Sequence, residues 1–331
     1  MSDLTWQLIV VLALVLAAEF VNGWNDAPNA IATVVSTRVL RPYHALAMAS
    51  FLNVLGAAVT GTAVAATIGK GIVMPGAIGL PVVGAAVLGI AIWGAVATLR
   101  GLPISISHGL VAGLAGAGLA ASGPDVLLWV GWQKVLIGLG FSTVVGFSLA
   151  LILMVILYWV LRHTRPALVR AIFGRLQIVS AAFMAFSHGS NDGQKFMGVF
   201  TLALVLGGVL PEFHVPWWVI LLCGSVMGLG TAVGGWRVMR TMGSGLTKLE
   251  PVHGFAAETA AASAITVATS LGVPLSTTHT INTAIMGVGA SRRLSAVRWS
   301  VSGNIVAAWI LTFPICFALS AVFALAFDLL F

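Results

Sequence analysis

Two short polar segments place carboxylate and amide side chains inside an otherwise apolar chain. The first contains Asn25, Asp26 and Asn29, and the second contains Asn191 and Asp192. A carboxylate at membrane depth is costly unless it is paired, solvated or protonated. Aspartate and asparagine oxygens are hard ligands of the kind that suit Na+, and a single aspartate can carry a proton. Because the Asn-Asp pair occurs twice, we expect a cation or proton site here rather than a surface loop.

The second polar segment differs from the first in one charged position. Lys195 stands where the first segment has Asn29. A lysine there can neutralise an aspartate or attract an anion, and it can equally extend its ammonium group to the membrane interface. His188 can donate to the site or act as a hydrogen-bonded structural histidine. The residue types leave these alternatives open.

Two further polar motifs consist of a proline followed by small hydroxyl residues and then a histidine, His108 or His279. This pattern is typical of an extended segment that leads into a helix N-terminus, where free N–H groups and the helix dipole favour an anion. N-capping by the same hydroxyls is the simpler explanation for one such motif. Because the motif occurs twice, we expect an anion site, with the candidate residues Ser105, Ser107, Ser276, Thr277 and Thr278.

One more carboxylate, Glu258, lies in an alanine-rich apolar stretch. So apolar a stretch predicts a functional position that faces a cavity. The candidate residues for a coupling cation or proton are therefore Asp26, Asp192, Asn29 and Glu258. A bound Na+ ion would take its ligands from Asp26, Asn25, Asp192 and Asn191.

The composition defines the elements that must position these residues. The chain has 331 residues, of which 59% are hydrophobic and 8% charged, with a mean hydropathy of +1.06. Soluble domains carry about 25% charged residues, so an ordinary soluble enzyme is excluded. Long unbroken apolar runs also argue against an outer-membrane barrel, whose strands alternate apolar and polar residues. The sequence therefore predicts an all-α integral membrane protein.

The excess of basic residues has a membrane explanation. The chain carries 16 Lys and Arg against 9 Asp and Glu. Basic residues collect in the cytoplasmic loops of membrane proteins. Nucleic acid is therefore not an expected partner. Cys223 and Cys316 lie in apolar runs and are expected to be reduced thiols.

The polar motifs recur in the same order along the chain. The segment 23–26 matches 189–192 at an offset of 166 residues, and 101–108 matches 272–279 at an offset of 171. Internal repeats with interrupted hydrophobic segments are typical of secondary transporters, whose site lies at the repeat interface.

We therefore divide the chain into a first transmembrane repeat (1–161), a basic cytoplasmic linker (162–176) and a second transmembrane repeat (177–331). The linker contains the most basic stretch of the sequence, which is why we place it in the cytoplasm. Three short apolar segments follow polar motifs, and they predict discontinuous or re-entrant helices: 29–40, 109–121 and 196–210.

The twin Asn-Asp motifs, together with the twin Pro-x-Ser-x-Ser/Thr-His motifs, resemble the PiT family of inorganic phosphate transporters. The resemblance covers nearly the whole chain, and the length is similar to that of the short prokaryotic form. It implies two inverted-topology repeats with about 10–12 helical segments and phosphate bound between them near mid-membrane. It also implies uptake coupled to Na+ in some members and H+ in others, sometimes with phosphate carried as a neutral metal complex.

Two departures from the family pattern leave the coupling ion open. Asn53 stands where some members have a glutamate, and Ile106 and Ser107 replace the commoner Thr-Thr pair. Some bacterial relatives carry sulfate, which has the same shape as phosphate but holds no proton at neutral pH. An acceptor for the phosphate proton, such as Asp26, Asp192 or Glu258, favours phosphate.

The sequence therefore predicts a secondary active transporter that moves inorganic phosphate, coupled to Na+ or H+, by alternating access between the two repeats. The predicted phosphate ligands are the Ser and Thr residues of the two proline motifs together with Asn25 and Asn191. A sulfate permease of the same family is the nearest alternative, ahead of a passive anion channel and an intramembrane enzyme. We expect a multi-pass protein of the inner membrane in contact with lipids, with no cofactor besides a bound Na+. The resemblance also suggests a homodimer.

Overall fold

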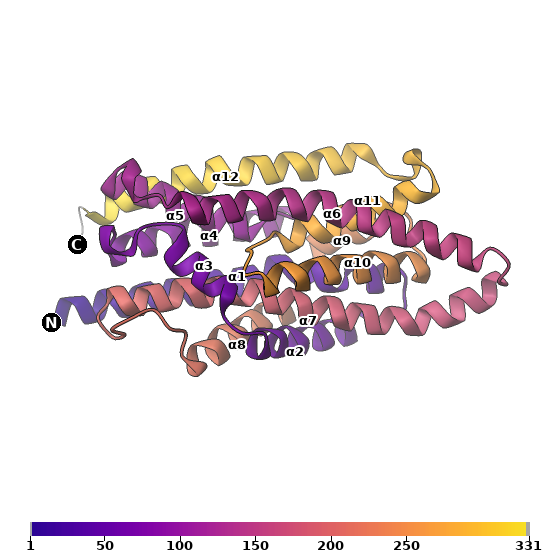
Figure 1. Cartoon of the computed structure of the whole chain (residues 1–331), viewed down its shortest axis with the longest axis horizontal. Helices are drawn as coiled ribbons and strands as arrows, with labels where there is room; N and C mark the ends of the chain where they lie inside the picture. Colours follow the sequence, from indigo (N-terminus) through magenta and orange to yellow (C-terminus); the bar gives the residue numbers. More distant parts are fainter. Residues whose placement is uncertain (1, 329–331) are drawn as a thin grey trace.

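The computed structural model describes residues 2–328, which are almost entirely helical (Figure 1). In chain order the α-helices of this part are α1 (Ser2–Ser36), α2 (Pro42–Val59), α3 (Ala63–Gly71), α4 (Leu80–Arg100), α5 (Ile106–Ser122), α6 (Trp129–Leu161), α7 (Pro166–Leu206), α8 (Trp217–Val233), α9 (Trp236–Gly243), α10 (Pro251–Ser270), α11 (Thr277–Arg292) and α12 (Trp299–Asp328). Single 3-10 turns occur at Pro75–Ala77, Pro124–Val126 and Leu294–Ala296.

Several of these helices are suited to a bilayer. A spanning helix needs roughly 20 apolar residues. Among the described residues, six helices are long and apolar enough to cross a membrane, namely α1, α2, α4, α6, α7 and α12. The pair α8 and α9 passes the same test together but is bent by 74°. The prediction of an all-α multi-pass membrane protein is therefore confirmed.

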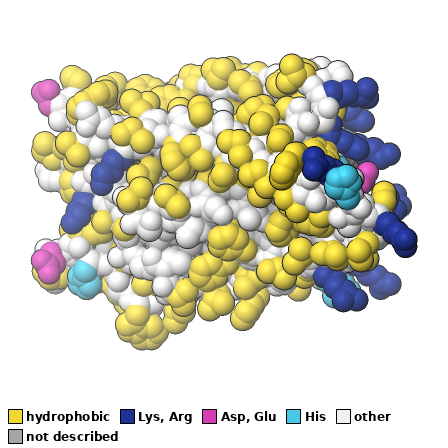
Figure 2. Space-filling view, turned by 45° about the vertical axis from the view of Figure 1, so that its right-hand side comes forward, with side chains coloured by type: hydrophobic (Ala, Val, Ile, Leu, Met, Phe, Trp, Pro, Cys, Tyr) yellow, Lys and Arg dark blue, Asp and Glu magenta, His cyan; other side chains and the backbone are white. Residues whose placement is uncertain are grey.

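The two ends of the helical bundle differ in charge. The start of α1 and the end of α12 lie at one end, and the turn that joins α6 to α7 lies at the other (Figure 1). Lys and Arg side chains are concentrated at the end that carries this turn (Figure 2). A pocket of about 620 Å³ there is lined by Arg38, Arg170, Lys248 and Arg298. Such a bias is the pattern that membrane proteins show at their cytoplasmic side.

Helices α1 and α7 run without interruption through the two Asn-Asp motifs. The prediction that the segments 29–40 and 196–210 form separate short helices is therefore wrong. The polar side chains of the motifs find partners on neighbouring helices, so the backbone remains helical. Within α1, Pro28 cannot donate to the carbonyl of Trp24. That carbonyl faces Gly235, where a Cβ would come within 2.8 Å of its oxygen.

Helices α5 and α11 do begin after a break. The extended segments 102–105 and 273–276 separate them from the preceding helices α4 and α10. Each segment follows a left-handed glycine, Gly101 with φ of 74° and Gly272 with φ of 65°, a conformation that glycine adopts at little cost. The expected short segment 109–121 is confirmed as part of a separate helix, α5.

Close helix crossings fix the two Asn-Asp motifs in space. A Cβ on Gly23 of α1 would lie 2.1 Å from the carbonyl oxygen of Met227 in α8. A Cβ on Gly189 of α7 would lie 2.2 Å from the carbonyl oxygen of Asn53 in α2. Helices in lipid associate through small residues that let their backbones approach in this way. Each glycine precedes a motif aspartate by three residues, so the crossings hold both carboxylates in the bundle interior.

Candidate functional site

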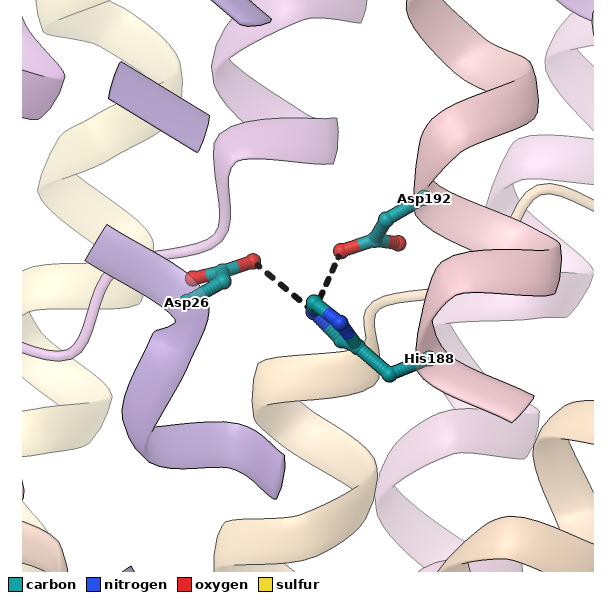
Figure 3. A group of neighbouring side chains, drawn as sticks. All are labelled: Asp26, His188 and Asp192. Carbon is teal, nitrogen blue, oxygen red and sulfur yellow. Dashed lines mark ion pairs between the residues drawn. The ribbon is translucent and has the colours of Figure 1, made fainter. Parts of the chain in front are cut away.

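Asp26 on α1 and Asp192 on α7 lie on either side of the His188 imidazole (Figure 3). Nε2 of His188 is 3.9 Å from Oδ2 of Asp26 and 3.3 Å from Oδ2 of Asp192. All three side chains are buried. Each offers one ligand atom, and the three atoms lie within 4.8 Å of one another, which is close enough to hold a metal ion. Two buried carboxylates at this separation need a cation or a proton to coexist.

Lys195 on α7 extends into the same cluster. Its ammonium group donates to Oδ1 of Asp192, to Oγ of Ser107 at 2.5 Å and to the carbonyl oxygen of Leu275 at 2.7 Å. The residue is only 1% exposed. Of the alternatives that the sequence left open, Lys195 therefore pairs with an aspartate and does not extend to the membrane interface.

The asparagines of the two motifs make matching contacts. Nδ2 of Asn25 donates to Oγ1 of Thr98 at 2.7 Å, and Nδ2 of Asn191 donates to Oγ1 of Thr269 at 2.9 Å. Within the described part of the chain, the Oδ1 atoms of Asn25, Asn29 and Asn191 are buried without a hydrogen-bond partner. An unpaired buried carbonyl oxygen costs about 1–3 kcal/mol. These oxygens are therefore well suited to accept a cation.

The starts of α5 and α11 adjoin each other. Oγ of Ser105 accepts from the N–H of His108 at 3.3 Å, and Oγ of Ser276 accepts from the N–H of His279 at 3.1 Å. Both serines are thus N-caps, which is the simpler role considered for these motifs. The rings of His108 and His279 have centroids 4.6 Å apart. Two helix N-termini, each with free N–H groups and a positive dipole end, therefore meet at one place.

The other hydroxyl residues of these helix starts contact the charged cluster. Thr277 donates to Oδ2 of Asp192 at 2.8 Å, and Thr278 donates to Oδ1 of Asp26 at 3.2 Å. Thr278 also accepts from Nδ2 of Asn29 at 3.0 Å. The structure thus brings together, by direct contacts, the predicted residues Asp26, Asn29, Ser107, Asp192, Thr277 and Thr278.

Glu258 lies apart from this cluster. Its carboxylate accepts from the hydroxyls of Thr33 and Ser180 and from Nε2 of Gln177 at 3.2 Å. Oε1 of Gln177 in turn accepts from the hydroxyl of Thr37 at 2.8 Å, and Thr37 lines the basic pocket at the end of the bundle. A series of hydrogen bonds therefore runs from Thr37 at the pocket through Gln177 and Glu258 to Thr33. Thr33 lies one turn after Asn29 on α1.

Replacing Glu258 by alanine is expected to destabilise the protein. Thr33, Ser180 and Gln177 would each lose an acceptor, and a buried donor left unpaired costs about 1–3 kcal/mol. Glu258→Gln keeps an acceptor oxygen and should cost less. Thermal unfolding in detergent, followed by size-exclusion chromatography, measures the difference. A Glu258→Ala protein that melts at the parent's temperature would contradict this assignment.

Three features of the site were missed or left undecided by sequence reasoning. His188 joins the two aspartates, although the sequence offered only its spacing of four residues from Asp192 as a signal. Its Nδ1 lies 3.2 Å from Oδ1 of Asn53, which sequence analysis noted only as a departure from a family pattern. Thr98 and Thr269 carried no signal of their own, yet they lie 171 residues apart, the offset of the proline motifs.

The fold and the site together define a helical membrane protein with a buried cluster of carboxylate, amide and hydroxyl side chains among its helices. A model of the phosphate transporter family matches residues 22–320, and the chain therefore belongs to that family. This confirms the resemblance found in the motifs. Membership in a transporter family also excludes the intramembrane enzyme considered above.

Relatives and one solved structure agree with this assignment. The chain is 46% identical to the "Probable low-affinity inorganic phosphate transporter" of Rhizobium meliloti over 99% of both chains. It is 38% identical to the protein of the same name from Bacillus subtilis over 98% of both chains. A solved structure of a protein described as "The sodium-dependent phosphate transporter" matches 98% of this chain and 100% of its own, with a TM-score of 0.89 and 26% identity.

Proposed function

We propose that this protein is a secondary active transporter that takes up inorganic phosphate across the inner membrane, coupled to Na+ or H+. One observation carries the proposal. Two aspartates and two helix N-termini, drawn from the two halves of the chain, meet in one buried site. The names of the relatives support phosphate as the substrate, and the sodium dependence named for the solved neighbour supports Na+ as a coupling ion.

In this mechanism cations or protons bind first beside Asp26 and Asp192, where the ammonium group of Lys195 already supplies one positive charge to Asp192. Without them, the negative carboxylates would repel an incoming phosphate in a medium of low dielectric. The amide oxygens of Asn25 and Asn191, which have no partner among the described residues, are further candidate ligands for Na+. Phosphate then binds between the starts of α5 and α11, where backbone N–H groups supply donors without further full charges. The hydroxyls of Thr277 and Thr278 can join them once they turn away from the neutralised aspartates.

Release on the other side requires the site to open. The residues of the cluster are at most 9% exposed, so neither side reaches them in this conformation. We propose two inverted-topology repeats, 1–161 and 177–331, in which α5 and α11 are the re-entrant elements. One repeat then rocks against the other to expose the site alternately. The matched pairs Asn25–Thr98 and Asn191–Thr269 support this pseudo-symmetry.

The charge bias of the bundle supports an orientation in the membrane. In our proposal the basic end, which carries the α6–α7 turn, faces the cytoplasm, and the start of α1 and the end of α12 lie on the outer side (Figure 2). The segment 162–176 is then the cytoplasmic connection between the repeats, made of the turn and the first part of α7. The homodimer stays a prediction.

Phosphate is favoured over sulfate by the acceptors in the site. Phosphate carries a proton at neutral pH, and a carboxylate such as Asp26 can accept a hydrogen bond from it. Sulfate has no proton to offer and would meet the same carboxylate without compensation. Phosphate is therefore the first candidate for the substrate, and sulfate is the second.

A transport assay in liposomes tests the proposed function. Purified protein reconstituted in vesicles is expected to accumulate labelled phosphate when a Na+ or proton gradient is imposed. Vesicles without protein and vesicles without a gradient are the controls, and unlabelled sulfate serves as competitor. Uptake that equilibrates without responding to either gradient would indicate a channel. Stronger competition by sulfate than by phosphate would indicate the sulfate permease.

A further inference from the structure

We infer that the ammonium group of Lys195 is a built-in substitute for one coupling cation at Asp192. This half of the site then needs no Na+ of its own, and the mobile coupling ion binds at Asp26. The inference rests on the proposed function, which it deepens by assigning the ion sites of the two halves different roles.

The contacts of Lys195 are those of a monovalent cation in an oxygen site. Its three acceptors are a carboxylate of Asp192, the hydroxyl of Ser107 and the backbone carbonyl of Leu275. They come from α7, from the start of α5 and from the extended segment before α11. Carboxylate, hydroxyl and unwound backbone carbonyl are also the groups that transporters offer to Na+ at a helix break.

The same contacts leave Lys195 with nothing to offer phosphate. An ammonium group has three N–H donors, and all three have an acceptor within the protein. The side chain is also buried. Its charge is therefore balanced locally by Asp192, and direct binding of the anion by Lys195 would require at least one of these bonds to break.

The other half of the site has the same plan without the charge. Asn29 occupies the position of Lys195 and donates to Thr278, whereas Lys195 donates to Ser107, which lies 171 residues earlier than Thr278. The Oδ1 atom of Asn29, three residues after Asp26, has no hydrogen-bond partner in the part of the chain that the structure describes. His188 on α7 faces both aspartates, with Nε2 closer to the carboxylate of Asp192, at 3.3 Å, than to that of Asp26, at 3.9 Å.

The two halves therefore differ by one positive charge at equivalent places. Asp192 has a tethered cation, whereas Asp26 has hydroxyl and imidazole neighbours. Within the described residues, amide oxygens without a partner occur at Asn25 and Asn29 in the first half and at Asn191 in the second. The mobile coupling ion therefore binds to and leaves the first half of the site, at Asp26. The second half keeps its cation through the whole cycle.

Lys195→Asn tests the inference, because asparagine already occupies the equivalent position 29. Initial rates of phosphate uptake into liposomes are measured as a function of Na+, with choline replacing Na+. Without the tethered charge, one more Na+ must bind at Asp192 before transport. The slope of log rate against log Na+ concentration, measured at low Na+, should therefore rise by about one. Lys134→Asn, at an exposed lysine, is the matched control and should keep the parent's slope.

A second measurement does not depend on transport. The melting temperature of each protein in detergent is compared in sodium chloride and in choline chloride. Na+ should raise the melting temperature of Lys195→Asn by about 5 °C more than that of the parent, because it binds only the folded site. A variant that is unfolded in both salts, or that gains nothing from Na+, contradicts the inference, since Na+ should restore the missing partner of Asp192.

These readouts separate the inference from the proposed function. If the parent takes up no phosphate under any gradient, the proposed function fails, while the melting comparison still tests whether Na+ replaces Lys195. If Lys195→Asn instead needs more phosphate for half-maximal uptake at every Na+ concentration, with an unchanged slope, Lys195 is a phosphate ligand and the inference fails.

Discussion

Replacing Asp26 by asparagine should lower the initial rate of phosphate uptake by at least about 100-fold, because removing one partner of a buried charge pair from a binding site costs about 3 kcal/mol. Asparagine has nearly the shape of aspartate and can still accept from the hydroxyl of Thr278, which now lies 3.2 Å from Oδ1 of Asp26. What the variant lacks is the negative charge that holds a mobile cation or proton. The measurement is uptake of labelled phosphate into liposomes under a Na+ gradient and, separately, under a proton gradient.

Two controls give the Asp26→Asn result its meaning. Asp125→Asn removes the same charge from an exposed turn and should transport at the parent's rate. The melting temperature of Asp26→Asn should also stay near the parent's, because the substitution keeps the size of the side chain and its contact with Thr278. A folded Asp26→Asn protein with the parent's uptake rate would contradict the role given to this carboxylate.

The types of the site residues could be predicted from the sequence because polar groups are rare in this chain. Each one inside an apolar helix needs a partner, and the doubling of the motifs reveals which ones belong together. Asp26, Asp192, Ser107, Thr277 and Thr278 were found in this way, and their contacts with one another or with Lys195 join α1, α5, α7 and α11.

The path of the backbone through the motifs was harder to predict. Glycine, proline and polar residues in a row indicate a break. Breaks do occur before α5 and α11, where a glycine and a proline are followed by hydroxyl residues. The glycine-containing and amide-containing motifs of α1 and α7 lie within continuous helices, even though α1 also contains Pro28. The difference comes from tertiary contacts, because the amides of Asn25 and Asn191 donate to threonines on other helices. Such contacts cannot be predicted from the local sequence.

The position of Glu258 illustrates the same limit. Its apolar surroundings indicated a buried carboxylate with a function, but they gave no direction for the side chain. The structure gives it the partners Thr33, Gln177 and Ser180 rather than the central aspartates. In our proposal Glu258 can still act in coupling as the acidic group between the site and the basic pocket, and its role there stays a prediction.

Gly189→Ala is expected to have a large effect although it changes no charged group. The new Cβ would lie 2.2 Å from the carbonyl oxygen and 2.4 Å from Cα of Asn53. These are backbone atoms of α2, so the clash cannot be relieved by turning a side chain, and α2 and α7 must separate. Overpacking of this kind costs about 3 kcal/mol or more. Because His188 is the neighbouring residue and contacts Asn53, the shift also displaces the imidazole that faces both aspartates.

Gly174→Ala in the same helix is the matched control, because a Cβ there meets no atom within 4 Å. It should leave uptake unchanged and stabilise α7 by about 0.5–1 kcal/mol through helix propensity. The yield of monodisperse protein, its melting temperature and phosphate uptake per folded molecule are measured for both variants. Gly189→Ala should be lower than the parent on all three measures, since the crossing both supports the bundle and positions the motif. Normal uptake by folded Gly189→Ala protein would mean that the geometry around His188 tolerates a movement of α7, and a rigid, closely packed site could then no longer be the basis of transport.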